Sequence, residues 1–179
     1  MKKWTFLCVP LLCLGMFTRG QDLRVVLIRH AEKPAKGDNL TCQGLNRALA
    51  LPKVLYAKFG TPDFTYVPAL GLGNATKRAR MFQTVTPMAA RYNLTVNSSL
   101  EEKDSTAIGS ELLSRKGTVL VVWEHKAIPM IARALGVKEA GLTWNDDDFD
   151  SIWIVTFPGG RPTLTKDKEG LQPAAACPE

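Results

Sequence analysis

The sequence predicts a layered α/β domain built around a mostly parallel sheet. Two continuous apolar runs, at residues 25–28 and 118–123, are typical of strands that are buried on both faces. Segments with helical spacing of apolar residues alternate with strand-like segments along the chain. The chain has no internal repeat, long linker or low-complexity tract, so this alternation describes one domain.

Helix caps, helix-breaking residues and the spacing of apolar residues predict the individual helices and strands. Thr41 is a good N-cap for a helix whose apolar face carries Leu45, Ala48 and Leu49, and Pro52 is expected to kink or restart this helix. The remaining expected elements are a strand at 64–67, a helix from Thr76, a strand at 93–96, a helix opened by Asp104 or Ser105, a helix at 128–135, and strands at 151–157 and 163–165.

Residues 1–20 have the organisation of a secretory signal peptide. The segment combines basic Lys2 and Lys3, an apolar stretch at 6–17 broken only by Pro10, and small residues in Thr18-Arg19-Gly20 before Gln21. A membrane helix is one alternative, but the apolar run is too short to span a bilayer comfortably. A lipoprotein anchor on Cys8 or Cys13 is another, although no small-residue cleavage box precedes either cysteine. We expect an exported protein, periplasmic or extracellular, with no stable membrane insertion after cleavage.

The mature chain is expected to form one domain over residues 21–170, followed by a flexible tail over 171–179. Loss of the three basic residues before residue 21 lowers the formal net charge from +6 to +3. A small excess without a basic run rich in aromatics does not indicate a nucleic-acid partner, and it suits an anionic small substrate. Cys42 and Cys177 remain, either as a pair in an oxidising compartment or as separate thiols.

Both histidines of the chain follow strong strand signals. His30 comes after 25–28 and Arg29, and His125 comes after 118–123 and Glu124. The carboxyl ends of parallel strands face the crevice where α/β domains bind ligands, so the two imidazoles are predicted on one rim. A metal site would need a third ligand and supporting carboxylates, and Arg29 would repel a cation. Arginine beside imidazole instead suits an oxyanion such as phosphate.

Four segments carry motifs in a consistent order. Residues 27–34 contain Arg29-His30-Ala31, and residues 40–48 fit the pattern Leu-Thr-x-x-Gly-x-x-x-Ala. Residues 76–84 fit Ser-x-x-x-Arg-x-x-Gln-Thr with threonine for the serine, and Trp123-Glu124-His125 follows. Together they resemble the histidine phosphatase superfamily, in which Arg-His-Gly and Gly-His are the commoner forms of the first and last motifs. The resemblance covers most of the mature chain and implies its phosphoglycerate-mutase-like, three-layer α/β/α fold.

The resemblance also implies an activity: phosphatase chemistry on phosphomonoesters through a phosphohistidine intermediate. His30 would attack phosphorus, and Arg29, Arg80 and His125 would bind the phosphoryl group and stabilise its charge in the transition state. The arginines supply the positive charge, so no metal and no cofactor is expected.

Arg78 and Arg80 compete for one role in the third motif. Residues two apart lie on different faces of a helix, and the register of Gln83-Thr84 selects Arg80. Arg78 is expected to face solvent, with an auxiliary phosphate contact as the alternative.

The sequence does not identify which residue is the general acid. In many members of the superfamily a carboxylate from a loop beyond the second arginine protonates the leaving oxygen. The candidates for this proton donor are Glu102, Asp104, Glu101 and Glu124. The acidic run at 146–148 is expected to form a solvated loop, with Phe149 beside it as a packing residue.

The alternative function is a module of the same fold that binds phosphate or another anionic ligand without turnover. The uncertain acid keeps this alternative open, whereas the presence of both histidines and both arginines favours the enzyme. The expected partner is a small phosphorylated substrate. The sequence indicates neither the leaving group nor an oligomeric state.

Overall fold

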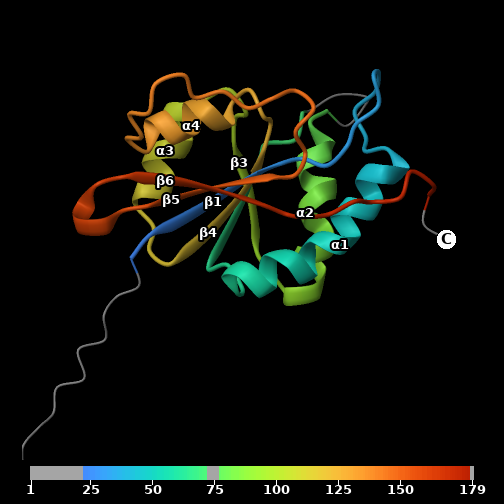
Figure 1. The fold of residues 1–179 in the computed structure, drawn as a ribbon, viewed down its shortest axis with the longest axis horizontal. Coiled ribbons are helices and arrows are strands. Elements are labelled where there is room, and N and C mark those ends of the chain that lie inside the picture. The colour runs from blue at the N-terminus through green and yellow to red at the C-terminus, as the bar shows by residue number, and fades with distance from the viewer. Residues whose placement is uncertain (1–21, 72–76, 178–179) are drawn as a thin grey trace, which may run out of the picture.

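The computed structural model describes residues 22–71 and 77–177. The predicted signal peptide and Thr76 lie outside these residues. Within them, a six-stranded sheet lies between two layers of helices (Figure 1). The elements are β1 (Arg24–Arg29), α1 (Cys42–Phe59), β2 (Phe64–Pro68), α2 (Ala79–Tyr92), β3 (Val96–Leu100), α3 (Ser105–Leu113), β4 (Thr118–Trp123), α4 (Ile128–Ala134), β5 (Ser151–Thr156), a short 3₁₀ turn (Pro158–Gly160) and β6 (Thr163–Lys168).

The strand order in the sheet is β3-β2-β4-β1-β5-β6. β3, β2, β4 and β1 run parallel, whereas β5 pairs antiparallel with β1 and β6 pairs antiparallel with β5. The mostly parallel α/β sheet predicted from the sequence is therefore confirmed. β1 and β4, the two strongest apolar runs, are neighbours in the centre of the sheet, where burial on both faces requires such runs.

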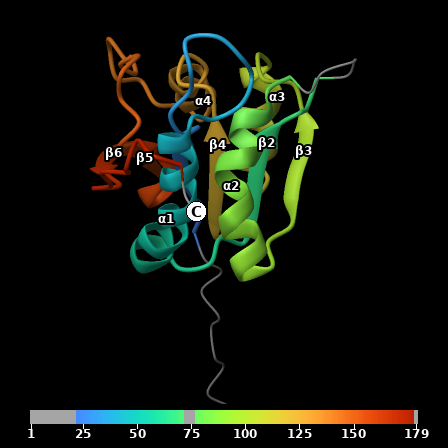
Figure 2. The same cartoon turned by 90° about the vertical axis from the view of Figure 1, so that its right-hand side faces the viewer.

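The sheet separates two apolar cores, which is the three-layer arrangement expected. α1 and α2 cover the face seen in Figure 2, where Leu51, Leu55, Val85 and Met88 pack on alternate residues of β1 and β4. α3 and α4 cover the other face, where Ile108, Leu112, Ile128 and Ile131 meet the intervening strand residues. The alternation along each strand supplies one side chain to each core in turn.

Three elements differ from the sequence-based expectation. α1 runs through Pro52 without interruption, and its buried side contains Ala48 and Leu51 while Leu45 and Leu49 are exposed. β3 starts later than expected because Asn93 adopts a left-handed conformation (φ 51°) that ends α2 and turns the chain. The start of α2 also shifts, to Ala79. The predicted caps Thr41 and Asp104 are confirmed, since their side chains accept hydrogen bonds from Gly44 N and Ala107 N.

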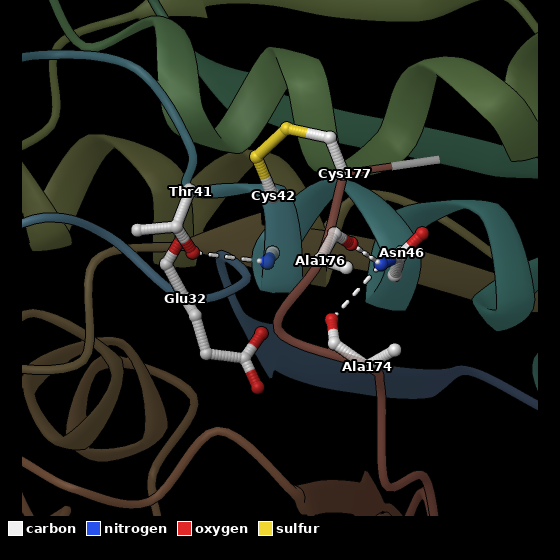
Figure 3. Close-up of a disulfide and its surroundings, with 8 residues drawn as sticks. Glu32, Thr41, Cys42, Asn46, Ala174, Ala176 and Cys177 are labelled. Carbon is white, nitrogen blue, oxygen red and sulfur yellow. Dashed lines mark hydrogen bonds between the residues drawn. A yellow bond between two sulfur atoms is a disulfide. The ribbon is translucent and has the colours of Figure 1, made fainter. Parts of the chain in front are cut away.

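The C-terminal segment is tied to the first turns of α1 (Figure 3). Cys42 and Cys177 form a disulfide across 135 residues of sequence, with their Cα atoms 4.4 Å apart. The Asn46 amide donates hydrogen bonds to the carbonyls of Ala174 and Ala176 at 2.9 and 2.7 Å. The sequence predicted a flexible tail over 171–179, whereas these contacts tether it to α1 as far as Cys177.

We expect reduction of this disulfide, or Cys177→Ser, to lower the free energy of unfolding by about 2–5 kcal/mol. A cross-link that closes a long loop restricts the unfolded chain, and long loops give effects in the upper part of that range. Thermal melts with and without reductant measure the change. Asn46→Ala, which removes only the two tail hydrogen bonds, is the control and should cost far less. Equal melting temperatures in both redox states would contradict the expectation.

Within the described ranges 22–71 and 77–177, no helix is long and apolar enough to cross a membrane.

Candidate active site

The carboxyl ends of β1 and β4 lie side by side and carry the two histidines. Arg29 pairs in register with Trp123, and the His30 N–H donates to the Trp123 carbonyl at 3.1 Å. The chain leaves both strands directly after this point, so Glu124 and His125 emerge beside His30. Both imidazoles are buried, with 0% of His30 and 4% of His125 exposed. The structure thus places both histidines at one edge of the sheet.

A backbone carbonyl orients the His30 ring. Nδ1 donates to the Ala31 carbonyl oxygen at 2.7 Å, so Nε2 carries the lone pair. Nε2 is buried and has no hydrogen-bond partner within the described chain. Burial, opposed by the Ala31 carbonyl and assisted by the charges of Arg29 and Arg80, lowers the pKa of His30 to about 3. At physiological pH this side chain is a neutral imidazole with an available nitrogen, which is the form that a nucleophile needs.

A cavity of about 210 Å³ lies beside His30. Its other lining residues carry two guanidinium groups, three carboxylates and one thioether, from Arg78, Arg80, Asp38, Glu102, Glu124 and Met81. Two larger hollows, at the amino ends of β1 and β4 and beside Phe149, are lined by neither histidine. Guanidinium groups next to a neutral imidazole can hold a tetrahedral oxyanion against a nucleophile.

Both arginines of the third motif line this cavity. Arg80, in the first turn of α2, donates from Nη2 to the Gly37 carbonyl at 2.7 Å, and its Nε is buried with no partner among the described residues. Arg78 is the N-cap residue and has a left-handed backbone (φ 61°). The Arg78 side chain is 30% exposed and lines the cavity, which agrees better with the auxiliary phosphate contact than with a position wholly in solvent. Because Arg78 precedes the regular helix, the helical face of Arg80 does not fix the direction of its side chain.

Arg29 is held by the loop that precedes β5. Its Nη1 donates to the carbonyls of Asp146 at 2.5 Å and Asp148 at 3.2 Å, and its guanidinium lies 3.7 Å from the centroid of the Phe149 ring. Burial lowers the pKa of Arg29 from its usual value, while neighbouring carboxylates, Glu124 foremost, oppose that shift. Arg29 is therefore close to His30 but is anchored outside the cavity wall.

His125 lies between two carboxylates. Its Nε2 donates to Asp146 Oδ1 at 2.7 Å, and its Nδ1 lies 2.6 Å from Glu124 Oε1, out of line for a hydrogen bond. The hydrogen bond to His125 holds the pKa of Asp146 below its usual range. The acidic loop 146–148, expected to be only solvated, thus contacts both His125 and Arg29.

The four candidate acids differ in whether they line the cavity. Glu101 pairs with Arg78 at 2.9 Å and is largely exposed, and Asp104 caps α3. Glu102 and Glu124 line the cavity. Burial, reinforced by the nearby charge of Glu124, raises the pKa of Glu102 above its usual range. Glu102 is therefore the candidate acid whose protonated form the surroundings favour.

Gln83 and Thr84 fix the chain that surrounds the cavity. The Thr84 hydroxyl accepts from Ala31 N at 2.9 Å and donates to the Arg80 carbonyl at 2.8 Å. Gln83 accepts from Leu40 N at 3.0 Å. These bonds tie α2 to both ends of the loop after β1, so the two residues act by positioning His30 and Arg80.

Glu32 connects the same loop to α1. Its carboxylate accepts three hydrogen bonds from Arg47, two from Nε and one from Nη2, and Arg47 also pairs with Glu169 at 2.5 Å. Gly44 permits the close approach of α1, because a Cβ there would lie 2.3 Å from the Glu32 carbonyl oxygen. Burial raises the pKa of Glu169 to about 8, although Arg47 opposes this. The second motif therefore secures the residues that follow His30.

Sequence reasoning missed Asp38 and the loop 146–148 as parts of this site, and it included Arg78 only as an alternative, auxiliary phosphate contact. The clue to Arg78 was its place beside Arg80 in the third motif. No sequence spacing relates His30 to Asp38 or His125 to Asp146, so the sequence contains no signal for these two acids. Among the residues that the structure describes, no group of three or more His, Cys, Asp or Glu side chains is arranged to hold a metal ion.

Comparisons with known proteins bear on the fold. No protein-family sequence model and no curated protein sequence matches the chain. Solved structures do match: the protein histidine phosphatase SixA complexed with tungstate has a TM-score of 0.57 and 18% identity, over 82% of this chain and 97% of that one. Phosphoserine phosphatase from Entamoeba histolytica, in complex with phosphoserine, has a TM-score of 0.58 and 13% identity, over 83% and 97%.

A third match is a putative α-ribazole-5′-P phosphatase from Escherichia coli, with a TM-score of 0.56 and 15% identity over 89% of this chain and 100% of that one. At these identities the likeness concerns architecture, and it spans nearly the full length of each neighbour. It agrees with the mixed α/β architecture of this chain, a six-stranded sheet between two layers of helices. The chain therefore has the phosphoglycerate-mutase-like α/β fold of the histidine phosphatases.

Proposed function

We propose that the protein is a phosphatase that hydrolyses phosphomonoesters through a phosphohistidine intermediate on His30. The observation that carries the proposal is the His30 imidazole itself. It is neutral, its Nδ1 is fixed by the Ala31 carbonyl, and its Nε2 is unpartnered in the described chain. It shares a cavity with Arg78 and Arg80. The fold shared with histidine phosphatases supports the proposal.

In the first step, His30 Nε2 attacks phosphorus, and the bond from phosphorus to the leaving oxygen breaks as the N–P bond forms. Glu102 gives its proton to that leaving oxygen. In the second step, the Glu102 carboxylate accepts a proton from water, whose oxygen attacks phosphorus. The N–P bond breaks, inorganic phosphate leaves, and His30 returns to its neutral form. Arg80 neutralises the non-bridging oxygens in both steps.

Arg29 and His125 belong to the same proposal. Neither residue lines the cavity itself, but Arg29 precedes His30 at the end of β1 and His125 follows β4, whose Trp123 carbonyl accepts from the His30 N–H. This shared edge of the sheet supports a position near the phosphoryl group. Both also contact Asp146. In the reaction, some of these contacts would be exchanged for contacts to phosphoryl oxygens.

Hydrolysis of phenyl phosphate tests the proposal. Its leaving group requires little help from an acid, so turnover depends mainly on the nucleophile and the arginines. Release of inorganic phosphate by the purified protein is the expected result. Binding of inorganic phosphate without turnover of any phosphomonoester would favour the alternative, a binding module of the same fold.

Glu102→Gln should lower kcat for an alkyl phosphate by about 10²-fold or more, because an alkoxide leaves poorly without a proton. The protonated acid is the active form. Since its pKa is raised, activity should persist to a higher pH than an ordinary glutamic acid would allow and then fall as the pH rises through that pKa. His30, with a pKa of about 3, adds no acid limb above about that pH.

The pH profiles of the wild type and the Glu102→Gln variant measure this effect, and the alkaline limb should be missing in the variant. Asp104→Asn is the matched control, because asparagine also caps a helix. An unchanged profile in Glu102→Gln would reject this acid without rejecting the nucleophile.

Export to the periplasm or the cell exterior remains part of the proposal. It rests on the character of residues 1–20. The disulfide between Cys42 and Cys177 supports it, because such bonds persist mainly in oxidising compartments.

A further inference from the structure

We propose that Arg78 binds a second anionic group of the substrate, on the leaving-group side of the phosphoryl site. The inference rests on the proposed function and narrows it. The preferred substrates would be phosphomonoesters whose leaving group carries a carboxylate or another phosphate.

The backbone at Arg78 is unusual and directs the side chain into the cavity. Among the described residues other than glycine, only Arg78 and Asn93 have a positive φ. Asparagine adopts the left-handed region readily, whereas for arginine this conformation is unfavourable. Such residues cluster at ligand sites, where the surrounding structure holds them. Here the left-handed turn places the Arg78 guanidinium in the wall that also contains Arg80.

Arg78 keeps donors for a ligand. Its Nε is buried without a partner within the described chain, and Nη1 pairs with Glu101 Oε2 at 2.9 Å. The Glu101 side chain is 65% exposed, so this ion pair is screened and contributes little to stability. An incoming anion can replace Glu101 at low cost.

The position of Arg78 separates its role from that of Arg80. Arg80 donates to the Gly37 carbonyl, whereas Arg78 pairs with Glu101, the residue that precedes Glu102. Arg78 and Glu102 line the same cavity, and Arg78 is the foremost of the positive charges, ahead of Lys103 and Arg80, that oppose the raised pKa of Glu102. Because Glu102 is the proposed donor to the leaving oxygen, a cation on its side of the cavity faces the leaving group.

The test compares phenyl phosphate with its 2-, 3- and 4-carboxyphenyl analogues. For at least one carboxyphenyl isomer, Arg78→Gln should lower kcat/KM by about 10-fold or more, which is the scale of one lost charge-assisted hydrogen bond. The loss on phenyl phosphate should be several times smaller. Each loss is the ratio of kcat/KM between the wild type and the variant on one substrate, so differences in leaving-group reactivity between the substrates cancel. Glu101→Gln, which frees Arg78, should raise kcat/KM for the same isomer.

Lys77→Gln is the matched control, because it removes the same charge from an exposed neighbouring residue. The dissociation constants of the same compounds, measured by calorimetry in a His30→Ala background, give the comparison without turnover. Equal losses on phenyl phosphate and on every carboxyphenyl isomer would overturn the role of Arg78. Absence of turnover in the wild type would overturn the proposed function instead, and the binding comparison would still decide the role of Arg78.

Discussion

Replacing His30 with alanine should lower kcat/KM for phenyl phosphate by about 10⁴-fold or more. Removal of a catalytic nucleophile leaves only the contribution of binding and charge stabilisation, and losses of this size are usual. The only group in the cavity with a free, neutral nitrogen lone pair among the described residues is His30 Nε2. No other nitrogen nucleophile of the described chain therefore lines the cavity to replace His30.

Two controls separate chemistry from folding in this variant. His30 makes a single side-chain hydrogen bond, to the Ala31 carbonyl, so the melting temperature should change little compared with the loss of rate. The variant should also still bind inorganic phosphate, because Arg78 and Arg80 remain. Activity within about 100-fold of the wild type in a well-folded variant would contradict the assignment of the nucleophile.

Arg47→Met should lower the free energy of unfolding by about 3–5 kcal/mol. The Arg47 side chain is buried between Glu32 and Glu169, whose side chains are 13% and 1% exposed. Removing the Arg47 guanidinium leaves two acidic side chains buried without an opposite charge. Burial of such groups is unfavourable when no partner compensates for the lost hydration, so the folded state is destabilised. Because Glu32 follows His30 by two residues, the variant should also lose activity at temperatures where it is still folded.

Chemical denaturation measures this effect. Lys58→Met is the matched control, since it removes an exposed lysine that pairs with Asp167 at 2.8 Å, and it should cost less than about 1 kcal/mol. Adding Glu32→Gln and Glu169→Gln to Arg47→Met should recover much of the loss. A cost of less than about 1 kcal/mol for Arg47→Met alone would show that this cluster does not stabilise the fold.

The features that the sequence predicted correctly are those encoded locally. The runs at β1 and β4 are continuous because both faces of a central strand are buried, so the strands and the histidines that follow them are visible without a structure. Thr41 and Asp104 were also recognisable as helix caps, because each side chain accepts a hydrogen bond from a backbone N–H only three residues away. The parallel sheet follows from the alternation of such elements.

The features that were missed depend on contacts through space. The face of α1 was assigned from Leu45, Ala48 and Leu49, but of these only Ala48 is buried. The buried side also contains Arg47, whose charge is paired with nearby Glu32 and distant Glu169. Arg78 was assigned to solvent because its left-handed backbone is not visible in a helical pattern. The hydrogen bond from Arg29 to Asp146 joins residues 117 positions apart, and no periodicity predicts it.

A direct measurement of the covalent intermediate tests the central claim. The protein is mixed with a phosphomonoester labelled in its phosphoryl group, quenched within milliseconds under alkaline denaturing conditions, and digested for mass spectrometry. The account predicts a labelled, acid-labile phosphoramidate on the peptide that contains His30, formed and lost at rates consistent with turnover. Turnover without label on the protein, or label on any residue other than His30, would contradict it.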